Sequence, residues 1–114
     1  MSLGNFTLGS TVRLPLQIVE NGGLPVSTSI IDSVKVIKII KPDLSFVSGY
    51  PKSMQLIDSE ESLYYSDYKP KDIGNYIVIY NITINEVVFS QIDSFYVSAS
   101  ASNERVGIPT AKPV

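Results

Sequence analysis

The chain has 114 residues, of which 44% are hydrophobic and 18% charged, and its formal net charge at pH 7 is -2. This composition is typical of one globular domain rather than a disordered chain, and the charge gives no reason to expect a nucleic-acid partner. Cys and His are both absent, which excludes disulfides and thiolate metal sites and removes the commonest general base.

The first predicted strand covers residues 11–20, because apolar residues recur there at every second position: Val12, Leu14, Leu16 and Ile18. A period of two is typical of a strand with one buried face. Pro15 cannot donate to a ladder, so it predicts an edge strand or a bulge. Asn21 and two glycines then predict a turn.

The second predicted strand covers residues 32–41, which are rich in Val and Ile on both faces. This favours a central strand, or one whose parity shifts through a bulge near Ile37, over a helix. Its lysines fall at positions that solvent would cover: Lys35, Lys38 and Lys41. Two shorter strands are predicted at residues 44–47 and 53–57.

Three further strands are predicted at residues 62–68, 74–84 and 87–98, the last of them bulged or bent near residues 91–94. Residues 84–86 supply the turn before it. Seven short strands and no helix predict an antiparallel β-sandwich in residues 1–98. Residues 99–114 lose the alternation and gain small, polar and Pro residues, so we expect an extended tail or linker.

The stretch DIGNY, residues 72–76, comes just before the long strand at residues 74–84. Gly74 permits a close backbone approach, Asp72 can accept from nearby donors, and Tyr76 can bury its ring while its hydroxyl finds a partner. These three residues therefore predict a structural corner between the sheets.

This stretch resembles the D-x-G-x-Y tyrosine corner of immunoglobulin-like sandwiches. Antibody-type domains have a Cys where this chain has Val78, and a Trp that this chain lacks. The resemblance is therefore to disulfide-free modules, such as those of tailed-phage virion proteins, bacterial surface proteins and macroglobulin-like proteins. The matching pieces are residues 8–18, 41–43, 63–68 and 74–80. The resemblance implies an immunoglobulin-like β-sandwich of about seven strands.

Four of the seven tyrosines are candidate binding residues: Tyr50, Tyr64, Tyr65 and Tyr68. Alternation cannot hide both Tyr64 and Tyr65, so one of them faces away from the core. Exposed tyrosines provide contact area for protein or carbohydrate partners, but outward tyrosines also pack across strands. Both readings stay open, and packing is favoured.

No catalytic, metal or cofactor site is expected. Asp58, Glu60 and Glu61 form an acidic cluster, which we interpret as a solvated turn because Ca²⁺ needs 6–8 converging oxygens. Gly22 and Gly23 lack the Lys and helix of a phosphate-binding loop. No stretch approaches the roughly 18 apolar residues of a membrane span, and the N-terminus does not resemble a signal peptide.

The sequence thus predicts a non-catalytic structural or interaction module, most plausibly of a phage virion or a bacterial surface. It would bind protein partners, including copies of itself, through a sheet edge, the tyrosines and the C-terminal tail. The alternative is an accessory carbohydrate-binding domain of a larger enzyme, with coplanar tyrosines stacked on sugar rings. A small hydrolase, the third class, would need a concave pocket with convergent carboxylates.

Overall fold

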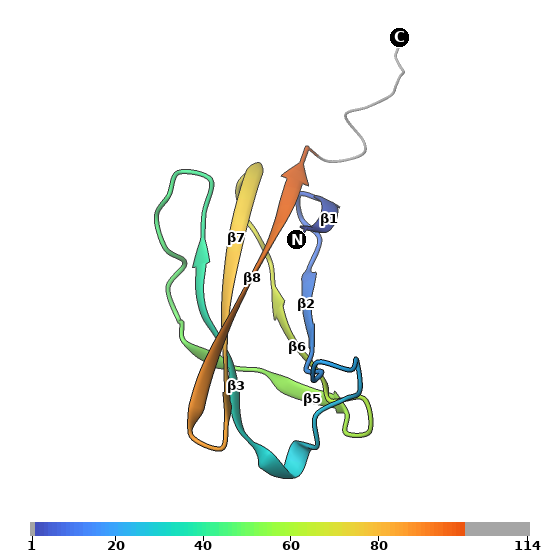
Figure 1. Ribbon diagram of the computed structural model, residues 1–114. Helices are drawn as coiled ribbons and strands as arrows, with labels where there is room; N and C mark the ends of the chain where they lie inside the picture. Colours follow the sequence, from blue (N-terminus) through green and yellow to red (C-terminus); the bar gives the residue numbers. More distant parts are fainter. Residues whose placement is uncertain (1, 100–114) are drawn as a thin grey trace, which may run out of the picture.

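A computed structural model describes residues 2–99, which form strands arranged in two sheets (Figure 1). The strands are β1 (Ser2–Thr7), β2 (Val12–Gln17), β3 (Ile31–Ile40), β4 (Lys52–Ser53), β5 (Gln55–Asp58), β6 (Leu63–Tyr68), β7 (Gly74–Ile84) and β8 (Val87–Ser98). The larger sheet has the order β1-β8-β7-β3-β4 and the smaller one β2-β6-β5. The predicted all-β class with two sheets is confirmed.

The core lies between the sheets and consists of the inward residues of each strand. In β2 every second residue is buried, beginning with Val12, and in β7 the buried set begins with Tyr76. The Tyr76 ring is stacked on Phe95 of β8 with centroids 4.9 Å apart. Burial of this apolar area, at about 25 cal/mol per Å², is the main stabilising contribution.

The predicted edge position of β2 and the predicted bulge in β3 are confirmed. β2 lies at the end of the smaller sheet, as Pro15 predicts. The register of β3 against β7 shifts between Val36 and Lys38, which places a bulge at Ile37. The bulge predicted within residues 91–94 of β8 is wrong, because β8 pairs with β7 without a register shift from Val87 to Val97.

Three strand assignments need correction. β1 was not predicted; it contains Gly4 and Asn5, poor strand formers, and forms by parallel pairing with β8. Residues 44–47 are a loop that makes only an isolated bridge at Phe46, because Leu44 has a φ of 72°. Residues 53–57 are divided between β4 and β5, which belong to different sheets.

A tight hairpin joins β7 to β8. Its two loop residues, Asn85 and Glu86, have φ values of 48° and 68°, as a type I′ turn requires. The flanking pair, Ile84 and Val87, is hydrogen-bonded in such a loop, so the odd-numbered residues of β8 bond to β7. The even-numbered residues of β8 turn their backbone groups toward the other side.

The last described strand ends at Ser98, and the predicted tail from residue 100 onward lies outside the described residues. Within residues 2–99 no helix is long and apolar enough to span a membrane.

Candidate functional site

The DIGNY stretch forms a hydrogen-bonded corner at the start of β7. The Tyr76 hydroxyl donates to the Asp72 carbonyl oxygen (2.9 Å) and accepts from the Asp72 N–H (3.1 Å). Burial raises the pKa of Tyr76, which keeps the hydroxyl protonated as a donor. Gly74 has a φ of 133°, and a Cβ there would lie 2.8 Å from Pro42. This corner has a structural role.

The four candidate tyrosines do not form one row: Tyr64, Tyr65 and Tyr68 lie on the two faces of β6, and Tyr50 lies in the loop before β4. Tyr50, Tyr64 and Tyr68 pack against the hydrophobic core. Burial raises the pKa of Tyr68 to about 12, and its ring meets Tyr76 edge-on with centroids 6.0 Å apart. The neighbouring residue, Tyr65, faces outward, as alternation demands.

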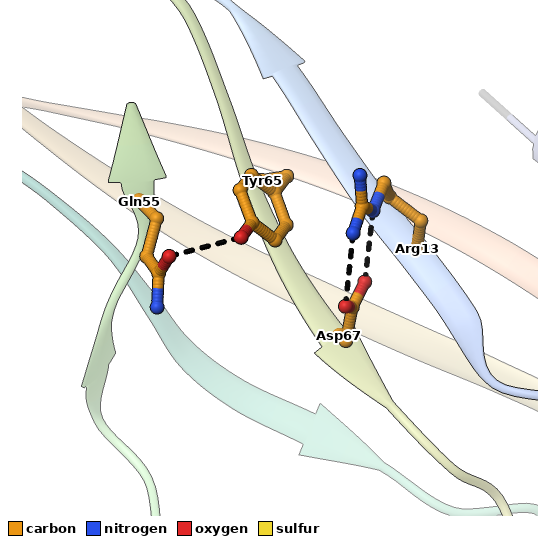
Figure 2. A network of polar contacts seen from close by, with 4 residues as sticks. All are labelled: Arg13, Gln55, Tyr65 and Asp67. Atoms are coloured by element: carbon orange, nitrogen blue, oxygen red, sulfur yellow. Dashed lines mark hydrogen bonds and ion pairs between the residues drawn. The ribbon is translucent and has the colours of Figure 1, made fainter. Parts of the chain in front are cut away.

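Tyr65 is held in a network on the outer face of the smaller sheet (Figure 2). Its hydroxyl donates to Gln55 Oε1 (2.9 Å), and the Arg13 guanidinium lies 4.0 Å from the ring centroid. Arg13 in turn donates to both carboxylate oxygens of Asp67, at 3.0 and 3.1 Å. These bonds lower the pKa of Asp67. One face of the Tyr65 ring is therefore covered by Arg13.

A surface pocket of about 510 Å³ brings together two of the tyrosines, Tyr50 and Tyr68. Its other polar lining is mainly basic: Lys41, Lys52, Lys69 and Lys71, with Asp67 and Asp72. Sequence reasoning selected these two tyrosines but not the lysines, which are separated along the chain and meet only through folding.

The acidic cluster at residues 58–61 is a turn. Asp58 Oδ1 accepts from the backbone N–H of Glu60 (2.9 Å) and of Glu61 (3.2 Å). Gln17 binds the Glu61 side chain at 3.1 Å. Within residues 2–99 no group of three or more acidic side chains could hold a metal ion.

The first half of β8 is an exposed apolar segment. The sequence indicates the last strand as one that could pair with a copy of itself, but not this half of it in particular. β1 pairs with β8 only from Ser94 onward, and Figure 1 shows it beside the far end of that strand. In the described part of the chain, no strand pairs with the outer edge of residues 88–92. The apolar side chains are more than half exposed: Val87, Val88, Phe89 and Ile92.

This segment reads VVFSQI from residue 87 to 92 and contains no charge and no Pro. Three of the strands at the ends of the two sheets are blunted: β2 has Arg13 and Pro15, β4 is two residues long, and β5 has a register shift before Asp58. Charges, prolines, short strands and bulges are the usual protections of an edge strand. The absence of any of them in VVFSQI was the signal available in the sequence.

An apolar groove of about 970 Å³ runs between β2 and the first half of β8. Leu16 and Ile18 line one side, and Ile82 and Phe89 line the other. Asp93 also lines this groove. Its side chain is only 5% exposed, and its Oδ1 atom has no hydrogen-bond partner. A buried oxygen without a donor is unfavourable by about 1–3 kcal/mol.

Burial raises the pKa of Asp93, and the positive charge of the terminal amino group offsets part of that rise. The carboxyl therefore contributes fully to stability below its unfolded pKa of about 4, and this contribution is lost as the pH rises through the folded value.

We expect Asp93→Asn to raise the free energy of unfolding by about 1 kcal/mol at pH 7 and to change it little near pH 3. Urea unfolding at both pH values measures this. A variant less stable than the parent at pH 7 would show that the carboxylate is paired after all.

No family model and no curated protein sequence matches the chain. Among solved structures, an endo-fucoidan hydrolase from glycoside hydrolase family 107 is similar, with a TM-score of 0.51 and 12% identity. The similarity covers 88% of this chain and 13% of the hydrolase chain. At this identity the likeness shows the fold alone, and this chain corresponds to a small part of the larger protein.

Proposed function

We propose that this chain is a non-catalytic, immunoglobulin-like module that binds protein partners by strand addition at the free edge of residues 88–92. The strand order and the Tyr76 corner support the immunoglobulin-like assignment. The observation that carries the binding proposal is the unpaired, uncharged edge beside an apolar groove. Structural proteins of phage virions and bacterial surfaces are the setting that the sequence resemblance suggests.

Strand addition needs two things that this edge provides. The backbone groups of Val88, Ser90 and Ile92 point away from β7, so they can form the ladder that gives such complexes their affinity. The groove can then select the side chains of the added strand that face it by their shape and polarity.

Ser90→Pro tests the proposal, because the Ser90 N–H points to the free edge and its removal leaves the β7 ladder intact. The probe is a labelled peptide of alternating Thr and Val flanked by Gly-Ser pairs, followed by fluorescence anisotropy. We expect Ser90→Pro to weaken binding by about tenfold or more. Ser90→Ala, the control, loses the hydroxyl bond to Asn81 but should bind like the parent. Equal binding by Ser90→Pro and the parent, or no binding by either, contradicts the proposal.

A second candidate function, an accessory carbohydrate-binding domain, is favoured by the pocket at Tyr50 and Tyr68. The four lysines around it suit a negatively charged glycan, and an aromatic side chain can pack against a sugar ring. The similar solved structure is a hydrolase, and the similarity covers only 13% of its chain. This is compatible with an accessory module. Affinity electrophoresis in neutral and sulfated polysaccharide gels tests this, and retardation by the sulfated one alone is expected.

A further inference from the structure

We infer that the strand accepted at residues 88–92 carries a basic side chain that reaches Asp93, followed by apolar side chains at alternate positions. This inference rests on the proposed function and specifies the chemistry of its partner. It starts from a contrast within the groove, whose lining is mainly apolar, with Gln17, Glu20 and Asn21 on the β2 side, and which has a buried carboxyl group with an unpartnered oxygen on the β8 side.

The register of β8 sets where each partner side chain would lie. Odd-numbered residues of β8 face inward, since Phe95 and Val97 are in the core. In an added antiparallel strand, the residues opposite Gln91, Phe89 and Val87 would face the same way, into the groove. These three residues form non-hydrogen-bonded pairs with the added strand, because Val88, Ser90 and Ile92 supply the hydrogen bonds of the ladder. The Cβ atoms of the two residues in each such pair lie about 4.5–5.5 Å apart.

The position opposite Gln91 is the one that can reach Asp93. Diagonal neighbours across a pair of strands lie about 7–8 Å apart, within the span of a Lys or Arg side chain. The position directly opposite Asp93 lies in line with β1, which pairs with β8 from Ser94 onward. The basic residue therefore belongs opposite Gln91, near the N-terminal end of an antiparallel partner.

The next two inward positions call for apolar side chains. One lies opposite Phe89 and faces Leu16 and Ile18 across the groove, and the other lies opposite Val87 near the hairpin. The partner pattern is thus basic, any, apolar, any, apolar. Within residues 2–99 the ion pair found is Arg13 with Asp67 on another face, so no described Lys or Arg pairs with Asp93. A cation from the partner would add to the positive charge of the terminal amino group.

Three labelled peptides test the inference on the full chain, each flanked by Gly-Ser pairs. The first has the core TKTVTIT, the second replaces its Lys by Glu, and the third replaces it by norleucine, which keeps the length without the charge. We expect the Lys peptide to bind about tenfold or more tightly than either of the others. With Asp93→Asn this preference should fall to about threefold or less, at unchanged affinity for the norleucine peptide.

The outcomes separate the two proposals. Equal binding of the three peptides, all weakened by Ser90→Pro, would overturn the basic-residue pattern and leave strand addition standing. Failure of every peptide to bind would overturn both. A Lys preference that persists in Asp93→Asn would assign the cation to another carboxylate and contradict the inference. A peptide of the reversed order, TITVTKT, should bind like the norleucine peptide if the partner is antiparallel.

Discussion

Replacing Gly74 with alanine is expected to lower the free energy of unfolding by about 3 kcal/mol. Two separate causes contribute. The backbone at Gly74 has a φ of 133°, which L side chains rarely adopt, and an added Cβ would lie 2.8 Å from the Pro42 side chain. The Pro42 ring is held by its own backbone, so it cannot move aside as a flexible side chain would.

The matched control is Gly22→Ala, because a Cβ at Gly22 meets nothing within 4 Å and its φ is not positive. That variant should lie within about 0.5 kcal/mol of the parent by urea unfolding. Adding Pro42→Ala to Gly74→Ala should recover only the part of the steric loss that comes from the Pro42 Cγ atom, because the Cβ atom at position 42 remains, and it should leave the φ penalty. If Gly74→Ala were as stable as Gly22→Ala, the close contact at the corner would be disproved.

The second large effect is expected at Tyr76, whose ring is fully buried and stacked on Phe95. Tyr76→Ala should lower the free energy of unfolding by about 3–5 kcal/mol, because it removes the stacked ring and leaves a cavity. Tyr76→Phe keeps the ring and deletes the hydroxyl, which leaves the N–H and C=O of Asp72 without their partner. That loss alone should be about 1–3 kcal/mol.

Tyr65→Phe is the control for the hydroxyl, since it deletes a hydrogen bond to Gln55 on an exposed face. Water replaces that bond, so a loss below about 0.5 kcal/mol is expected. The chain has no Trp, so the transitions are followed by far-ultraviolet circular dichroism. Equal losses for Tyr76→Phe and Tyr65→Phe would mean that the corner contributes no more than a surface hydrogen bond.

Strands with strict alternation were predictable, because burial on one face dictates their pattern. β3 and β7 were placed within one residue of the structure and β2 within three, and the turn before β8 was placed correctly. The Ile37 bulge was readable as well, because two adjacent apolar residues broke the parity there. These features depend on residues close together in the sequence.

Features that depend on distant partners were not predictable in the same way. β1 contains Gly4 and Asn5 and is a strand only because β8 supplies its ladder. The division of residues 53–57 between two sheets follows from where β3 and β6 lie, not from local pattern. The groove escaped notice for the same reason: the first half of β8 is apolar on both faces, which from sequence alone indicates a buried central strand.

The pairing of β1 with β8 also has a kinetic meaning. Phe6 and Ser98 are linked by a hydrogen bond although they are 92 positions apart, so β1 has no partner until β8 has emerged from the ribosome. Contacts of such long range slow folding, typically to milliseconds or seconds. Until that closure the outer edge of β8 is unpaired along its whole length, and unpaired strand edges of this kind favour association between incompletely folded chains.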